Sequence, residues 1–208
     1  MSPLDLYELG LLHGGDVVVR ERNGRSGPLP LADWTCEQRP GDAGLVRRCR
    51  GAVLDLGCGP GRLTVAVSRT GLPALGVDLS AGALSLARAR GALVLSGCVF
   101  GELPAEGRWT TVLLADGNIG IGGDPCELLA RARRLLARDG RLLVEVLAPG
   151  TPSRCLHLRL ERGKRTSDWF PWAEVGTDDL APLAASCGLQ VDGRWHEAGR
   201  HFAALRTE

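Results

Sequence analysis

A chain of 208 residues is long enough for one sizeable hydrophobic core, so we expect a single domain, 1–208, with some additions. Its 44% apolar and 24% charged residues are ordinary for a soluble globular protein. The formal net charge of +1 gives no overall field that would favour nucleic acid or an anionic membrane.

The first 50 residues are predicted to form a cap in front of the main domain. We expect a short helix over 3–12 and a helix at about 41–50. Between them, residues 16–31 have a hairpin-like pattern that turns at Asn23-Gly24.

From residue 51 to residue 148, short apolar runs alternate with segments of helical period. This alternation predicts a parallel sheet with right-handed crossovers, and the apolar strands indicate helices on both faces. In the last helix the leucines fall on one side, and Arg131, Arg134 and Arg138 fall on another, solvated side. Asp139-Gly140 is predicted to close that helix. The predicted strands are 51–56, 73–77, 92–95, 110–115 and 141–147, and the predicted helices are 61–69, 81–90 and 125–138.

After residue 148 the alternation breaks. Residues 149–176 are predicted to be an insertion, with a two-stranded excursion over 154–175 that turns at 161–164. The remaining segment, 177–208, is predicted to hold a helix at about 178–187 followed by a pair of strands.

A loop with three glycines at alternate positions follows the first predicted strand of the core. Residues 52–63 read AVLDLGCGPGRL, and such a loop lets a ligand approach the backbone at a helix start. A dinucleotide fingerprint would need a third glycine where Arg62 stands. Asp55 would repel a pyrophosphate and attract an ammonium and a sulfonium, which favours a cationic amino-acid nucleoside. A tight turn without a ligand is the alternative.

An acid also ends the second predicted strand of the core. Asp78, in GVDLS, is well placed to accept hydrogen bonds from a ribose diol. The alternative for Asp78 is a helix cap, although Ser80 could cap that helix itself.

These two motifs in order, DLGCGPG and GVDLS, resemble motifs I and II of the class I S-adenosylmethionine-dependent methyltransferases, in their small-molecule branch. The resemblance covers residues 50 to 148. It implies an α/β, Rossmann-like sheet of seven mostly parallel strands with an antiparallel last strand, an N-terminal cap and a β insertion after strand five. It also implies S-adenosyl-L-methionine as cofactor and S-adenosyl-L-homocysteine as product.

The resemblance assigns roles to residues of the two motifs. By it, Gly57, Cys58 and Gly59 offer backbone to the methionine part, and Asp55 orders the ammonium. Asp78 binds the ribose and Leu79 lies against the adenine. The stretch after strand three, 96–100, lacks the acid that often binds the adenine, which leaves that role to backbone groups with Cys98 and Val99.

The loop after strand four lies under the transferable methyl group in this fold. It reads ADGNIGIGGDP over 115–125 and lacks the N/D-P-P-Y/F pattern of enzymes that methylate the amines of bases. Asp116 and Asn118 are candidate catalytic residues beside the reaction axis, Asp116 also a candidate cofactor ligand, with Ile119 as a wall. The alternative for Asp116 is that it only makes hydrogen bonds within the loop.

Two residues of the cap could reach the ligands. His13, in LLHGGD, is a candidate general base, and a surface or packing role is the alternative. Tyr7 could contact the cofactor carboxylate or the acceptor. The four histidines have no metal-ligand spacing and strand five does not end in Asp-Asn, so no metal is predicted.

Tryptophans in the cap and the insertion indicate the acceptor. Trp34, Trp169 and Trp172 fall in the two regions from which these enzymes commonly form the acceptor pocket, and aromatic walls suggest an apolar or planar acceptor. The alternative is that these rings only pack the insertion onto the sheet.

The sequence thus predicts O- or N-methylation of a small metabolite in bacterial secondary metabolism. The alternatives are an RNA or protein methyltransferase, or a member that keeps the cofactor without methylating. The oligomeric state is not predicted.

Seven scattered cysteines without a CxxC pair favour reduced thiols in a cytoplasm. No apolar run reaches the roughly 18 residues of a membrane span, and no export signal is present.

Overall fold

The computed structural model describes residues 1–207. Glu208, the last residue of the predicted C-terminal segment, lies outside the described residues.

The main sheet has seven strands in the order β11-β12-β7-β6-β3-β4-β5. The pairs among β3 to β7 are parallel, and the last strand, β12, runs antiparallel to both β7 and β11. This arrangement confirms the predicted Rossmann-like sheet of mostly parallel strands. The bounds are β3 Val53–Leu56, β4 Ala74–Asp78, β5 Val94–Ser96, β6 Trp109–Leu114, β7 Leu136–Val146, β11 Leu189–Glu197 and β12 Arg200–Thr207.

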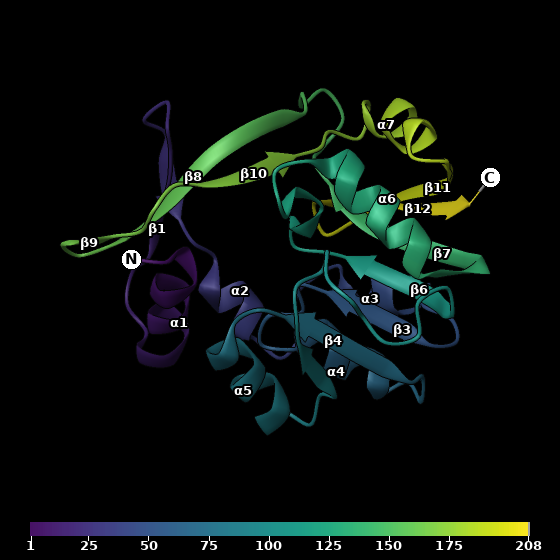
Figure 1. Ribbon diagram of the computed structural model, residues 1–208, viewed down its shortest axis with the longest axis horizontal. Helices are drawn as coiled ribbons and strands as arrows, with labels where there is room; N and C mark the ends of the chain where they lie inside the picture. The colour runs from purple at the N-terminus through teal and green to yellow at the C-terminus, as the bar shows by residue number, and fades with distance from the viewer. Residues whose placement is uncertain (208) are drawn as a thin grey trace.

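Helices cover both faces of this sheet. Side chains along each strand point alternately to one face and the other, so each face carries its own apolar core. Leu54 and Leu56 face one core together with leucines of α6 and α7, while Val53 faces a second core with residues of α3 and α4. Figure 1 shows α6 on one side of the sheet and α3 and α4 on the other. The helices are α3 Asp42–Val46, α4 Arg62–Ser68, α5 Ala81–Ala89, α6 Pro125–Leu135 and α7 Leu180–Ser186.

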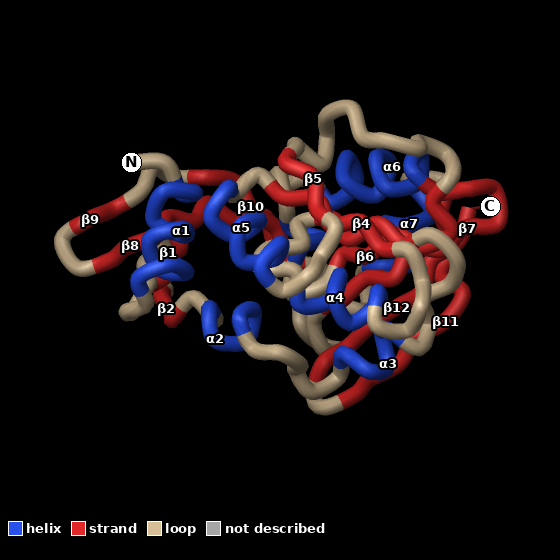
Figure 2. The backbone as a smooth tube through the Cα atoms, turned by 90° about the horizontal axis from the view of Figure 1, so that it is seen from below, coloured by secondary structure: helices blue, strands red, loops and turns tan. Residues whose placement is uncertain are grey.

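A second sheet, which we call the lid sheet, joins strands from the cap and the insertion. Its order is β10-β8-β1-β2, with β9 also paired to β8, and every pair is antiparallel. Figures 1 and 2 place this sheet and α1 to one side of the main sheet. The bounds are β1 Val18–Glu21, β2 Ser26–Pro28, β8 Arg154–Arg162, β9 Arg165–Thr166 and β10 Phe170–Glu174.

The cap and the insertion differ from the prediction in three details. The hairpin turns at Asn23-Gly24 as predicted, and the insertion turns after Arg162. The insertion has three strands, where two were predicted, and the helix predicted over 41–50 spans only five residues, Asp42–Val46. The cap begins with α1, Pro3–His13, and holds an unpredicted short helix α2, Leu31–Thr35.

The end predicted for the helix 125–138 is wrong. Leu136 is already extended (φ −69°, ψ 141°) and pairs with Trp109 of β6, so β7 begins where the helix was expected to continue. Gly140 does not cap a helix: it lies within β7, where a Cβ would be 2.8 Å from the Trp109 carbonyl oxygen. Pairing with β6 thus overrides the helical pattern of the sequence.

Arg131 was predicted to be solvated and is buried at 3% exposure. Its guanidinium donates to the carbonyl oxygens of Val99 and Gly101 and pairs with Glu106. Because a buried charge is costly unless it is paired, these acceptors explain how α6 carries an arginine on its inner face.

Candidate functional site

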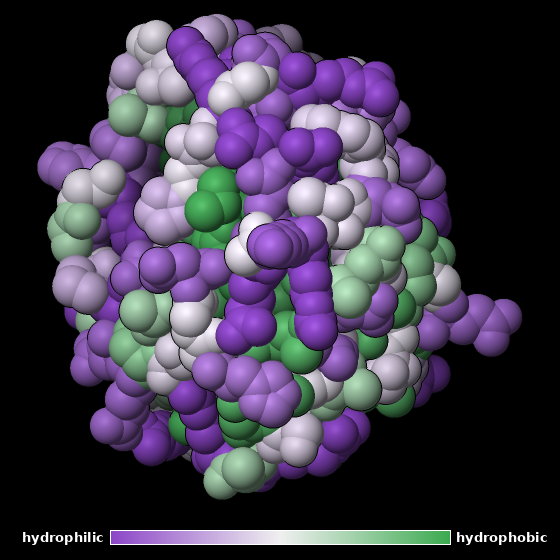
Figure 3. All heavy atoms as spheres, turned by 90° about the vertical axis from the view of Figure 1, so that its left-hand side faces the viewer, coloured by the Kyte–Doolittle hydropathy of each residue, from purple (hydrophilic) through white to green (hydrophobic). Residues whose placement is uncertain are grey.

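A cavity of about 1270 Å³ lies at the carboxyl ends of β3, β4, β6 and β7, and α1 and the lid sheet form its other wall. Strand order reverses between β3 and β6, and such a reversal is where open α/β sheets bind ligands. Figure 3 looks onto the lid side, where hydrophilic side chains dominate and apolar ones show only between them.

The glycine loop forms one wall of the cavity between β3 and α4. Gly57, Gly59 and Gly61 all have positive φ, at 72°, 52° and 80°, a conformation that favours glycine. The amides of Gly57 and Cys58 donate to the Val77 carbonyl at 2.8 and 3.0 Å, which ties the loop to β4. The loop is therefore a fixed, bare stretch of backbone.

Asn118 holds this loop from the other side. Its Nδ2 donates to the carbonyl oxygens of Leu56 and Gly57 at 2.9 and 2.8 Å. Both donor hydrogens of the amide are thus engaged by the chain itself. Asn118, predicted to be catalytic, is placed to position the loop, and only its Oδ1 is left to face a ligand.

Asp78 ends β4 beside the glycine loop, as the motif predicts. Its Oδ2 accepts from the Gly59 amide and its Oδ1 from the Ser80 amide, both at 2.8 Å. Ser80, and not Asp78, caps α5 by accepting from the Ala83 amide at 3.0 Å. Burial raises the pKa of Asp78, while the two backbone hydrogen bonds favour the ionised carboxylate and act to lower the pKa. The carboxylate is fixed at the cavity wall with lone pairs to spare for a hydroxyl.

Asp55 lies deeper, at 2% exposure, at the end of β3. Its Oδ2 accepts from the Thr64 hydroxyl at 2.7 Å. Its pKa is raised to about 6, mainly by burial and also by the nearby carboxylates of Asp116 and Asp78, while the hydrogen bond from Thr64 lowers it. An arriving cation would relieve this cost.

Asp116 belongs to a buried cluster of three carboxylates and three arginines, which we call the ion cluster. Its carboxylate accepts from Arg39 at 2.9 Å, from Arg200 at 3.0 Å and from Arg62. Burial raises the pKa of Asp116, while the guanidiniums oppose this shift. With φ at 55°, Asp116 is also one of three non-glycine residues between 1 and 207 that adopt the left-handed conformation.

The rest of the ion cluster comes from distant elements. Asp42 of α3 binds Arg62 and Arg200, and Glu145 of β7 binds Arg200 and the Asp116 amide. Sequence reasoning noted Arg62 only as a break in a glycine pattern and missed Arg39, Asp42, Glu145 and Arg200. Because three arginines already bind the Asp116 carboxylate, the cluster supports a structural and electrostatic role for Asp116 rather than proton abstraction.

An apolar rim lies beyond Asp78. Leu79 is 54% exposed, although large apolar side chains are usually buried, and it lines the cavity together with Cys98 and Val99. Phe100, not predicted as a site residue, lies on the same rim. The four side chains can enclose a flat apolar group.

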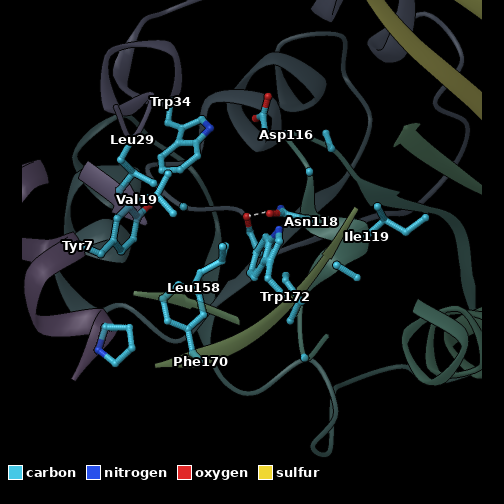
Figure 4. A pocket seen from close by; sticks show the side chains of 18 of the residues that line it. Tyr7, Val19, Leu29, Trp34, Asp116, Asn118, Ile119, Leu158, Phe170 and Trp172 are labelled. Carbon is cyan, nitrogen blue, oxygen red and sulfur yellow. Dashed lines mark hydrogen bonds between the residues drawn. The ribbon is translucent and has the colours of Figure 1, made fainter. Parts of the chain in front are cut away.

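The predicted acceptor residues Tyr7, Trp34, Ile119 and Trp172 all line the cavity. Tyr7 and Trp34 pack edge to face with centroids 5.9 Å apart, and Figure 4 shows both reaching in from the cap. A Cβ on Gly59 would be 3.1 Å from the Tyr7 hydroxyl. Burial and the charge of Asp78 raise the pKa of Tyr7, which keeps its hydroxyl a proton donor.

Two predicted site residues do not line the cavity. His13 is exposed at the end of α1 and is not among the residues that line the cavity, which favours its surface role over that of a general base. Trp169 packs between the guanidiniums of Arg22 and Arg159, 5.6 and 4.9 Å from the ring centroid. Arg22 belongs to the cap and Arg159 to the insertion, so Trp169 packs these two regions against each other and does not line the cavity.

The inner face of the lid sheet was missed, although its signal was present. Leu156, Leu158 and Leu160 alternate along β8 and face the cavity together. Phe170 and Trp172 repeat this pattern on β10, beside β8. Val19, Glu21 and Glu174 of the lid sheet also line the cavity, as do Leu29 and Ala173.

Among residues 1–207, no helix is long and apolar enough to cross a membrane. Within the same range, no three His, Cys, Asp or Glu side chains are grouped to hold a metal ion.

Residues 53–140 match the family described as a methyltransferase domain, and a search of the curated proteins finds no significant match. A solved SAM-dependent methyltransferase from Bacteroides fragilis, in complex with S-adenosyl-L-homocysteine, is 18% identical. The alignment covers 99% of this chain and 94% of that chain, with a TM-score of 0.80.

Two further solved structures are similar. The CcbJ methyltransferase from Streptomyces caelestis is 18% identical over 85% of this chain and 94% of that chain, with a TM-score of 0.62. The 1,6-didemethyltoxoflavin-N1-methyltransferase of Burkholderia thailandensis, with its namesake compound and S-adenosylhomocysteine bound, is 21% identical. There the alignment covers 85% and 80%, with a TM-score of 0.62. At these identities the likeness shows the fold.

Proposed function

Because residues 53–140 match the family described as a methyltransferase domain, we propose that the chain transfers the methyl group of S-adenosyl-L-methionine to a small molecule. The observation that carries the proposal is the fixed pair of Asp78 and the glycine loop at the cavity wall. We further propose a bacterial, cytoplasmic protein of secondary metabolism; the three similar structures described above come from bacteria, which supports the bacterial source.

The residues of the core fit this cofactor. Gly57, Cys58 and Gly59 would hold its methionine part, and the buried Asp55 would favour its ammonium. Asp78 would bind the ribose hydroxyls. The exposed Leu79, with Cys98, Val99 and Phe100, would enclose the adenine. When bound, the cofactor supplies an electrophilic methyl group.

The acceptor would occupy the part of the cavity under the lid sheet. A volume of about 1270 Å³ exceeds the roughly 300–1000 Å³ of a typical single-ligand pocket, which leaves room for two ligands. The leucines of β8 with Phe170 and Trp172 provide an apolar wall, which favours an apolar or planar acceptor for O- or N-methylation.

The described cavity residues would act mainly by alignment and exclusion of water. Asp116 and Glu145 are paired with arginines, and Tyr7 is a proton donor, so none of the three is poised to take a proton. Holding two reactants in line can by itself lower the barrier by several kcal/mol, on the order of 7–11 in favourable cases. The acceptor atom would thus arrive already nucleophilic.

Calorimetry with the purified full chain tests the cofactor. We expect S-adenosyl-L-homocysteine to bind, with affinity reduced by about 1–3 kcal/mol in Asp78→Ala, because hydroxyls lose a buried partner. Binding of NAD or ATP without any S-adenosyl compound would overturn the proposal.

Product formation tests the transfer. Incubation with S-adenosyl-L-methionine and candidate apolar acceptors should release S-adenosyl-L-homocysteine only when an acceptor is present. A chain that binds the cofactor and never forms this product with any acceptor would instead be a member that does not methylate.

A further inference from the structure

Two cysteines from distant parts of the chain bring their thiols together. Cys126 is the second residue of α6, and Cys187 directly follows α7. Their Sγ atoms are 2.9 Å apart, inside the van der Waals contact of two sulfur atoms. Among residues 1–207, no other two cysteine sulfurs come within hydrogen-bonding distance.

The surroundings give the two thiols different properties. Cys126 is half-buried and reachable from solvent, whereas Cys187 is 7% exposed. Ser186 Oγ lies 3.7 Å from the Cys126 sulfur and 3.6 Å from the Cys187 sulfur. Burial, together with the contact with Cys126, raises the pKa of Cys187 to about 11. Cys126 is therefore the thiol that meets an oxidant first.

We propose that Cys126 and Cys187 form a reversible disulfide that joins the start of α6 to the end of α7. A disulfide bond is about 2.05 Å long, so the two sulfurs need to approach by less than 1 Å. The co-reactant is a low-molecular-weight disulfide such as glutathione disulfide.

The exchange proceeds in two displacements. The Cys126 thiolate attacks one sulfur of glutathione disulfide, which forms a mixed disulfide and releases one glutathione thiolate. The Cys187 sulfur then attacks the Cys126 sulfur and releases the second glutathione. The protein loses two hydrogens and two electrons, and the oxidant gains them as two thiols.

The bond would restrain a segment next to the cavity. Ile121 and Gly122 line the cavity just before α6 begins, so fixing the start of α6 also limits movement of this segment. The bridge would close a loop of 61 residues, and we expect it to raise the Tm by about 5–10 °C. The inference is independent of the reaction proposed above.

Peptide mapping of the full chain tests the proposal. Trypsin should release residues 109–131, with Cys126 as their one cysteine, and residues 166–194, with Cys187 as theirs. After incubation with glutathione disulfide, alkylation and digestion, we expect the two peptides linked, with a mass about 2 Da below the sum of the two unalkylated peptides. Recovery of both as separate alkylated or glutathionylated peptides would overturn the proposal.

Serine variants separate this bridge from general thiol oxidation. Cys126→Ser and Cys187→Ser should abolish both the linked peptide and the rise in Tm. Cys155→Ser is the matched control, because Cys155 is exposed, and it should keep both effects. Loss of the rise in Tm in Cys155→Ser, or its survival in Cys126→Ser, would contradict the assignment.

Discussion

The side-chain amide of Asn118 donates a hydrogen bond to the Gly57 carbonyl at 2.8 Å. A Cβ at position 57 would collide with this amide, so glycine is needed there. The contact joins the loop after β6 to the loop after β3, so the position of the glycine loop depends on a residue 61 positions away.

Asn118→Ala should therefore weaken cofactor binding without unfolding the chain. Two hydrogen bonds to backbone carbonyls are lost, and we expect about 1–3 kcal/mol, roughly 5- to 150-fold in Kd. Calorimetry with S-adenosyl-L-homocysteine measures this loss. Asn118→Asp is the sharper variant, because it puts oxygen atoms against the two carbonyls and should bind worse than Asn118→Ala. An unchanged Kd in both would show that the loop does not depend on Asn118.

Asp55→Asn should stabilise the free protein and weaken its binding of the cofactor. The pKa of Asp55 is raised from 3.8 to about 6, so the folded state binds this proton more tightly and loses stability as pH rises from about 4 to 6. The variant escapes this loss, which is at most about 3 kcal/mol at pH 7. Urea unfolding from pH 4.5 to 7.5 measures the difference.

Asp55→Asn should bind the cofactor more weakly, although it makes the free protein more stable. Ionised Asp55 favours an ammonium, so the wild-type affinity for S-adenosyl-L-homocysteine should rise as pH passes 6, and this rise should vanish in the variant. Asp139→Asn makes the same charge change at an exposed site and should leave both curves unaltered. Equal affinities for wild type and Asp55→Asn at pH 7.5 would refute the electrostatic role of Asp55.

Asp42→Ala should cost about 3–5 kcal/mol of unfolding free energy, because it removes one of the two carboxylates, Asp42 and Asp116, that the buried Arg62 and Arg200 share. Burial raises the pKa of Asp42, but hydrogen bonds from these arginines outweigh it and lower the pKa overall. Its contribution is thus present above about pH 4 and is lost as pH falls further.

Denaturation with urea at pH 7 and at pH 3 checks this prediction, and the difference between Asp42→Ala and wild type should shrink at pH 3. Asp33→Ala is the control, since Asp33 pairs with Arg39 at 3.2 Å while 46% exposed. A surface pair of this kind contributes about 0–1 kcal/mol. Similar losses in both variants would argue against a special role for the ion cluster.

Trp172→Ala should remove acceptor binding, whereas Trp169→Ala should retain it. The two residues lie three positions apart, but only Trp172 lines the cavity, while Trp169 stacks with arginines on the lid sheet. Ligand-observed NMR screening of apolar aromatic compounds against both variants measures the difference. If compounds that bind the wild type are lost with Trp169→Ala and kept with Trp172→Ala, the acceptor site lies elsewhere.

The sequence by itself determined the main sheet, the glycine loop and the cofactor acids. Each of these depends on local patterns: alternating apolar runs specify strands, and glycine at 57, 59 and 61 permits the positive φ that all three adopt. Asp55 and Asp78 could be located in the sequence because each lies at the end of one of these apolar runs.

Only the tertiary structure decided the partners of distant residues. Asp42 and Arg200 are 158 positions apart, and β1 pairs with β8 through Val19 and Leu160. Hydrophobic periodicity tells which side of a strand is apolar and not which strand lies beside it. The ion cluster, the lid sheet and the early end of α6 all depend on such long-range contacts, whose energies outweigh the local preferences of the residues involved.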